Sequence, residues 1–268
     1  MSGMRGQVIV LPGVKAPDAP GAVKLQLSSA DVVASSMASL HRVMSPKSLV
    51  SLTNGGVAGY CRVSGEALIQ KGSVPSVLRL VKVGSKPALG LSYNLGLAGL
   101  AFQPGSASKS YTQVAVVSVA DPTDRVNFLF TFTDDTAISS TLRYDITTAS
   151  PSQKVFVCYG SSNNPPHAEV ARPAGTWAVV IVDYDDESRK VSIAVNQVDS
   201  FVENLKSVNH PVVDTSYFEV GYHASANGLR DAKVGDVYIF NESLRLNVAG
   251  MAQLGQLVAA LKAEYGIA

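Results

Sequence analysis

The sequence predicts an all-β protein, built as an antiparallel sandwich or barrel. One helix precedes this β region in the sequence and another follows it. Short apolar runs recur from residue 48 onward, at the spacing of about 8–12 residues that is typical of such folds. Val, Phe, Tyr and Thr, which favour strands, dominate these runs. The run "RVNFLFTFT" (125–133) alternates apolar and polar residues, as expected where a sheet covers a core on one side.

The composition limits the classes of protein that this chain can belong to. Its 268 residues suffice for one large β domain with an appendage, or for two smaller domains. Hydrophobic residues make up 46% of the chain and charged residues only 16%, against a usual share of about 25% for charged residues. The net charge of +1 provides no basic field for a phosphate backbone, so we expect no nucleic-acid partner.

Residues 1–47 are predicted to form an N-terminal arm followed by a helix. The strand candidates "QVIVL" and "VKLQL" flank a stretch with Pro12, Pro17 and Pro20, which prevents helix and interrupts sheet. A helix is predicted over residues 28–44, capped by Ser28 or Ser29 and ending before Pro46. Its apolar stripe consists of Val33, Met37, Leu40 and Met44.

Residues 48–268 are predicted to form one sandwich closed by a second helix. The strand candidates up to residue 160 are "SLVSLT", "YCRVS", "EALIQ", "VLRLVKVG", "SYTQVAVVSVA", "RVNFLFTFT", "STLRYDIT" and "KVFVCYG". Within "RVNFLFTFT", we expect Val126, Phe128, Phe130 and Phe132 to share one apolar face.

A pair of strands joined by the charged turn "DYDDES" follows, and Trp177 is predicted to open the first of them with a buried ring. The final stretch is predicted to be a helix that ends at Gly266 and packs on the edge of the sandwich. Its apolar face comprises Val248, Met251, Leu254, Leu257, Val258, Leu261 and Tyr265.

About the last 95 residues resemble the concanavalin A-like, laminin-G-like jelly roll. In that family a strand led by Trp precedes a Tyr-Asp turn and a Val-x-Ile-x-Val-Asn strand, and later motifs lead to a helix ending near Tyr-Gly. The matching residues are Trp177, Tyr184, Asp185, Val191, Ile193, Val195, Asn196, Gly221, Gly235, Val237, Ile239, Asn241, Leu244, Tyr265 and Gly266. The family usually has Gly after that Asn, whereas this chain has Gln197, which implies a different turn or a longer loop.

Catalytic patterns are missing from the sequence, so we expect no enzyme. Retaining glycosidases on related folds need two carboxylates about 5–5.5 Å apart, and none of the seven Glu forms such a pair within a strand. Asp183 and Asp185 have the spacing, but we interpret them as the solvated end of a hairpin. No Gly-x-Ser-x-Gly motif for a serine nucleophile is present.

No cofactor or metal is predicted. The four histidines lack metal-ligand spacing, and Asp134 and Asp135 are interpreted as turn formers rather than calcium ligands. Cys61 and Cys158 are interpreted as two buried thiols, and whether they pair in a disulfide stays open.

Two polar loops are candidate sites for a glycan, because each carries an aromatic residue that can stack on a sugar. The candidate ligand-binding residues are Tyr159, Asn163, Asn164 and His167 in the first loop, and Tyr222, His223 and Asn227 in the second. Plain connecting loops are the alternative interpretation.

Two functions follow as hypotheses. Jelly rolls of this kind usually act outside cells, yet the sequence shows neither a secretory signal nor an apolar run long enough for a membrane span. A virion protein, most simply a bacteriophage surface subunit, needs no such signal. Residues 1–47 would then bind other virion subunits or further copies of this chain. The alternative is a lectin-like module that binds a surface glycan.

Overall fold

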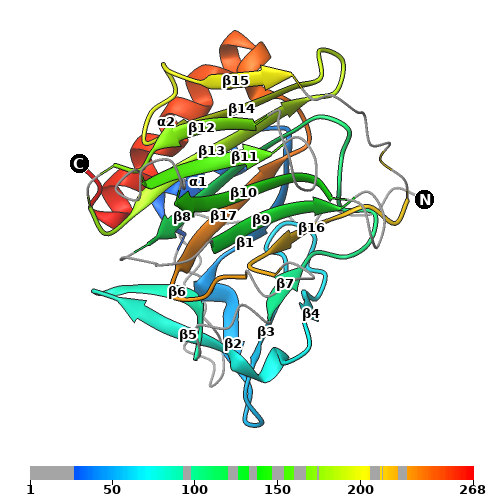
Figure 1. The fold of residues 1–268 in the computed structure, drawn as a ribbon, viewed down its shortest axis with the longest axis vertical. Helices are drawn as coiled ribbons and strands as arrows, with labels where there is room; N and C mark the ends of the chain where they lie inside the picture. Colours follow the sequence, from blue (N-terminus) through cyan, green and yellow to red (C-terminus); the bar gives the residue numbers. More distant parts are fainter. Residues whose placement is uncertain are drawn as a thin grey trace, which may run out of the picture.

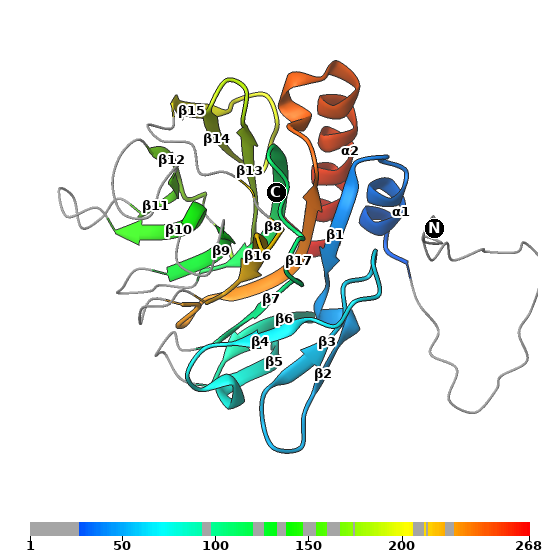
Figure 2. The ribbon, with the colours of Figure 1, turned by 90° about the vertical axis from the view of Figure 1, so that its right-hand side faces the viewer.

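The protein is built from two large stacked β-sheets with two helices on one side (Figures 1 and 2). Every strand pair that the structure describes is antiparallel, which confirms the predicted all-β class. The structure is a computed structural model, and it describes residues 27–92, 98–119, 126–132, 138–146, 154–159, 167–173, 175–205, 212, 214–222 and 228–268.

The first sheet has eight strands within the described residues. Its order is β15 (Val202–Leu205), β14 (Lys190–Val195), β13 (Ala178–Asp185), β8 (Tyr111–Ser118), β17 (Lys233–Phe240), β6 (Lys86–Leu91) and β5 (Leu78–Val83), and β1 (Leu40–Met44) also pairs with β17.

The second sheet has seven strands within the same described ranges. Its order is β12 (His167–Ala171), β11 (Lys154–Tyr159), β10 (Ile138–Ile146), β9 (Val126–Phe132), β16 (Tyr217–Val220), β7 (Gly99–Ala101) and β4 (Ile69–Lys71). A small hairpin pairs β2 (Leu49–Ser51) with β3 (Val57–Gly59) and projects from the lower part of the molecule in Figure 1. Short 3-10 turns occupy Pro46–Ser48, Pro75–Val77 and Leu244–Leu246.

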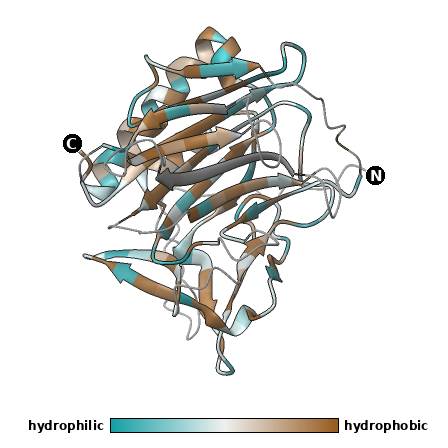
Figure 3. Cartoon of the chain, in the orientation of Figure 1, coloured by the Kyte–Doolittle hydropathy of each residue, from teal (hydrophilic) through white to brown (hydrophobic). Residues whose placement is uncertain are grey.

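The main core lies between the two sheets. It contains aromatic residues from both of them, including Tyr111 on β8 and Phe128, Phe156 and Phe218 on the second sheet. Figure 3 shows the hydrophobic residues concentrated along the strands. Burial of apolar area at this scale is the main term that favours folding.

The C-terminal helix α2 (Val248–Tyr265) begins and ends as the sequence predicts. The Asn247 side chain accepts a hydrogen bond from the Gly250 N–H, and Gly266 ends the helix with a φ of 66°. The predicted place of the helix, however, is wrong. Its buried side chains pack on the outer face of the eight-stranded sheet rather than on an edge, as Figure 2 shows. Val248 is 91% exposed, so it does not belong to the buried stripe.

The predicted N-terminal helix is wrong in its second half. Helix α1 spans only Ser29–Ser35, and Leu40–Met44 form β1, which pairs with β17. The ladder with β17 satisfies the backbone of this segment and buries Val43 and Met44, which outweighs the local helical pattern. Both α1 and β1 come from the predicted 1–47 unit and pack on the rest of the fold. The predicted arm strands lie outside the described residues, apart from Leu27.

The predicted apolar face of β9 is split between the two sides of the sheet. Val126 and Phe128 face the main core, whereas Phe130 and Phe132 belong to a separate cluster on the outer side. The register against β10 slips by one residue between Leu129 and Asn127, which is a β-bulge. Because a bulge inserts one residue, it reverses the alternation of the residues that follow.

Two further expectations are settled by the structure. No disulfide joins Cys61 and Cys158, and both side chains are buried. Trp177 is 6% exposed and its ring meets that of Tyr265 edge-on at 4.9 Å, which confirms its predicted burial. Among the described helices, none combines the length and the apolar character that a membrane span requires.

Candidate functional site

The structure places the candidate ligand-binding residues of the first loop at the end of the β11–β12 pair. Tyr159 and His167 are cross-strand partners there. Asn163 and Asn164 lie outside the described residues, as do His223 and Asn227 of the second loop, whereas Tyr222 is described and half-buried.

The two predicted loops do not come together. Tyr159 pairs with Thr141, which pairs with Phe130, so the first loop leaves the sheet at the end where β9 finishes and β16 begins. Tyr222 instead follows the opposite end of β16, just after Gly221. The strand register therefore places the two loops at opposite ends of the sheet, and they do not form a single site.

Tyr222 lies against the outer side of the seven-stranded sheet, next to Gly99. A Cβ added to Gly99 would come within 2.5 Å of the Tyr222 Cβ and 2.4 Å of the Val220 carbonyl oxygen. Only a glycine therefore lets the chain after β16 pass this close to β7. Gly99 in turn pairs with Lys71 on β4.

A group of aromatic and charged side chains occupies the same outer side, and we call it the outer-face cluster. Phe218 and Val220 of β16 face the main core, so by alternation Tyr217 and Glu219 face outward. Glu219 is flanked across the sheet by Ala101 and Phe130. The cluster consists of Lys71, Phe130, Phe132, Tyr217 and Glu219.

The rings of the outer-face cluster stack on one another. Tyr217 and Phe132 are cross-strand partners, and their rings lie nearly parallel, at 15° and 5.1 Å between centroids. The Lys71 amine sits 4.6 Å from the centroid of the Tyr217 ring, within the range of a cation–π interaction. The lysine stem is half-buried, whereas both rings are buried.

Glu219 is the unusual member of this cluster. It is 1% exposed, and its Oε1 atom finds no hydrogen-bond partner among the described residues. Burial raises the pKa of Glu219 to about 8, while the nearby Lys71 charge acts in the opposite direction. At neutral pH the group is therefore mainly a neutral carboxylic acid, which can donate as well as accept a hydrogen bond.

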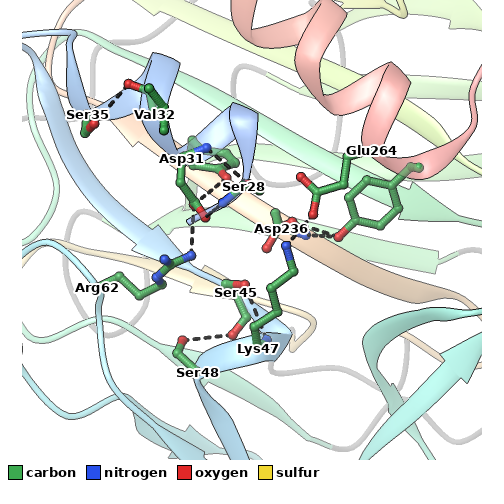
Figure 4. Close-up of polar contacts among 12 residues, drawn as sticks. Ser28, Asp31, Val32, Ser35, Ser45, Lys47, Ser48, Arg62, Asp236 and Glu264 are labelled. Carbon is green, nitrogen blue, oxygen red and sulfur yellow. Dashed lines mark hydrogen bonds and ion pairs between the residues drawn. The ribbon is translucent and has the colours of Figure 1, made fainter. Parts of the chain in front are cut away.

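A second polar cluster joins α1, the 3-10 turn Pro46–Ser48, β17 and α2 (Figure 4). The Asp31 carboxylate accepts hydrogen bonds from Arg62 Nη1 at 2.8 Å and from the Tyr238 hydroxyl at 2.9 Å. The Lys47 amine pairs with Glu264, whose neighbour Tyr265 donates a 2.9 Å hydrogen bond to Asp236.

These contacts link elements of the fold to one another and do not form a ligand-binding site. Beside them lies an open hollow of about 510 Å³, lined by Leu27, Ser28, Ser29, Lys47, Ala260, Ala263 and Glu264. Its two charged lining residues, Lys47 and Glu264, pair with each other, so the described lining presents no unpaired charge to a ligand.

The interpretation of Asp183 and Asp185 as a solvated hairpin end is wrong. Both belong to β13 and are buried. Asp183 accepts hydrogen bonds from the Thr112 hydroxyl at 2.6 Å and the Ser243 hydroxyl at 2.7 Å, and burial raises its pKa in spite of them. Residues distant in sequence supply these donors, which is why strand spacing alone did not indicate them.

The sequence analysis found Tyr222 but missed Lys71 and Glu219. Glu219 belongs to no pair of carboxylates in the sequence; it is a single charged residue in the otherwise apolar strand "YFEV". That contrast was the available signal. Among the described residues no group of three or more His, Cys, Asp or Glu side chains could hold a metal ion.

Comparisons with known proteins concern the fold alone. No protein-family model matches the sequence, and no curated protein is similar to it. Trypanosoma rangeli sialidase superposes with a TM-score of 0.55 at 16% identity, over 85% of this chain and 33% of the sialidase chain. The chain thus spans about a third of the sialidase's length. Domain 4 of AbnA, a GH43 extracellular arabinanase from Geobacillus stearothermophilus in complex with arabinotriose, superposes with a TM-score of 0.52 at 15% identity, over 82% of this chain and 98% of that domain.

Proposed function

We propose that the protein is a non-enzymatic, lectin-like module that binds a glycan on the outer side of its seven-stranded sheet. The observation that carries this proposal is the outer-face cluster, where stacked rings lie beside a lysine and a buried carboxyl whose Oε1 atom has no hydrogen-bond partner in the described part of the chain. Ligand sites in proteins typically combine apolar and aromatic walls with a few placed polar groups. The half-buried Lys71 and Tyr222 are the parts that a ligand would meet first.

Support also comes from the likeness in fold to the arabinanase domain. That domain is described in complex with arabinotriose, and the shared fold extends over 98% of it. We propose that the two-sheet fold is a jelly roll of the laminin-G-like kind that the sequence resembles. We propose a binding role rather than catalysis because, among the described residues, no carboxylate acts on the pKa of Glu219, so a second catalytic acid beside it has no support.

The binding proposal is tested with the full-length chain on a glycan array, followed by calorimetric titration of the best ligands. Lys71→Met keeps much of the stem on Tyr217 but removes the charge, and it should weaken binding by about tenfold or more. Lys82→Met, at an exposed position of β5, is the matched control and should bind like the wild type. If no glycan binds, or if both variants bind alike, the proposal is wrong.

We further propose that a virus particle, most simply a bacteriophage, displays this module, with the N-terminal segment bound to neighbouring subunits. The support is the sequence: a proline-rich segment precedes a fold of low charge content. Mass spectrometry of purified particles from the source of the protein tests this directly. Detection at a fixed stoichiometry is expected, and absence from intact particles would contradict it.

A further inference from the structure

We propose that the outer-face cluster selects acidic sugars, with the Lys71 ammonium binding the carboxylate of the ligand. This inference rests on the proposed glycan-binding function and names the class of glycan. Three observations carry it. Lys71 has no ion-pair partner among the described residues, its side chain is held against the Tyr217 ring, and the Glu219 carboxyl lies nearby.

Lys71 carries a charge that the described part of the protein leaves available. It makes no ion pair among the described residues, and its amine lies against the Tyr217 ring. A ring face attracts the ammonium without neutralising it. An anionic ligand group can therefore form a charge-assisted hydrogen bond with the amine.

The lysine is held in a defined place. Its strand β4 pairs with β7 at Gly99, where Tyr222 packs close, and its amine reaches over Tyr217 on β16. The backbone pairing fixes the origin of the side chain, and the contact of its amine with the Tyr217 ring restricts its rotamers before any ligand arrives. Less conformational entropy is then lost on binding, which raises the affinity of a single charged contact.

The carboxyl of Glu219 decides the sign of the local charge. Its described neighbours across the sheet are Ala101 of β7 and Phe130 of β9, neither of which titrates, and the charged or titratable groups beside it are Lys71 of β4 and Tyr217 of its own strand. Because burial raises the pKa of Glu219 to about 8, the lysine and the carboxyl together carry a positive charge at neutral pH.

The same carboxyl predicts how selection changes with pH. As the pH rises above about 8, Glu219 ionises and places a negative charge beside Lys71. The pair then carries no net charge, and the ionised carboxylate repels the carboxylate of a ligand. Affinity for an acidic sugar should therefore fall between pH 6.5 and pH 9, whereas affinity for a neutral sugar should change little.

The experiment compares matched ligands that differ in charge. The full-length chain is titrated at pH 6.5 with oligogalacturonate and its methyl ester, and with 3′-sialyllactose and lactose. We expect the acidic member of at least one pair to bind about tenfold or more tightly than its neutral partner. Lys71→Met should remove this preference, and the control Lys82→Met, at an exposed position, should keep it.

The pH series supplies a readout that a merely structural role of Glu219 would not change. The wild type should lose acidic-sugar affinity between pH 6.5 and pH 9, and in Glu219→Gln the ratio of affinities at these two pH values should stay near one. If neutral and acidic partners bind equally, the inference is wrong while the glycan-binding proposal stands. If neutral glycans bind and the acidic ones do not, the inference about acidic sugars is likewise wrong while the glycan-binding proposal stands. If no glycan of either kind binds, both proposals are wrong.

Discussion

Glu219 shows how a single side chain can link stability to pH in this protein. Its carboxyl is buried beside apolar neighbours on β7 and β9, so the fold favours the protonated form. In the unfolded chain the group ionises near its ordinary pKa of about 4.3. Because the pKa of Glu219 differs between the folded and the unfolded chain, the free-energy cost of burying it can be measured as a dependence of stability on pH.

Glu219→Gln should reduce the dependence of stability on pH. Between pH of about 4.5 and 8 the folded state keeps a proton that the unfolded state has lost, so the free energy of unfolding decreases as the pH rises. One such group contributes up to about 1.4 kcal/mol per pH unit. Urea denaturation at pH 5, 6.5 and 8 should show a shallower decrease for the variant and greater stability than the wild type at pH 8. Glu187→Gln, at an exposed position, should keep the wild-type slope.

Trp177→Ala should destabilise the protein through lost packing. The ring is buried between the first sheet and α2, edge-on to Tyr265, and truncation of such an aromatic residue costs about 3–5 kcal/mol. Thermal unfolding should show a large decrease in Tm, and Trp177→Phe a much smaller one. An unchanged Tm together with lost glycan binding would show that the ring serves a ligand instead.

At the scale of elements, the sequence correctly predicted the helices and strands whose pattern is local. It mispredicted those whose conformation depends on pairing with a strand far away in the sequence. The caps and apolar stripe of α2 are local, and the helix was predicted almost to its ends. Residues 40–44 have a helical pattern, but β17 offers them a ladder that only the folded chain contains. The bulge in β9 likewise arises from its register with β10, so the sequence could not indicate that Phe130 faces outward.

The candidate site was predictable only in part for the same reason. Tyr222 was found because an aromatic residue in a polar loop is visible in the sequence. Glu219 becomes unusual only when β7 and β9 are placed on either side of it, and Lys71 only when its amine reaches Tyr217. These contacts join segments that are far apart along the chain.

The junction of α1 with the sheet gives a prediction at the same scale. Burial by itself raises the pKa of Asp31, but the Ser28 N–H, the Arg62 charge and the Tyr238 hydroxyl outweigh it and lower the pKa. Asp31→Asn removes the charge and leaves Arg62, which is largely buried, without its partner. Breaking a buried pair in this way costs about 3–5 kcal/mol.

Urea denaturation at neutral pH should show this loss, and combining Asp31→Asn with Arg62→Met should recover part of it. Since the lowered pKa stabilises the fold above the ordinary pKa of a carboxyl, the difference from the wild type should shrink as the pH falls below about 4. A loss that is equal at pH 3 and pH 7 would show that the charge of Asp31 is unimportant.

At the scale of the whole molecule, three layers follow one another: the helices, the eight-stranded sheet and the seven-stranded sheet (Figure 2). The helices cover one outer face, and the candidate site lies on the opposite outer face. The described chain enters this arrangement at Leu27, on the helix side. A subunit held through its N-terminal segment would thus be attached on the side away from the site.

This geometry leads to a prediction about two truncations. Residues 1–26 contain Pro12, Pro17 and Pro20, which interrupt helix and sheet, so their deletion should leave the Tm within a few degrees of the wild type. Deletion of residues 1–47 also removes β1 from its ladder with β17, together with the buried Met37 and Met44, and should prevent stable folding. Circular dichroism and thermal melts distinguish the two truncations.

If the N-terminal segment binds neighbouring subunits, the shorter truncation should fold but no longer join the particle or oligomer, as sedimentation or light scattering would show. If it still assembles at the wild-type stoichiometry, docking through residues 1–26 is wrong, and the contact must lie on the folded part of the chain.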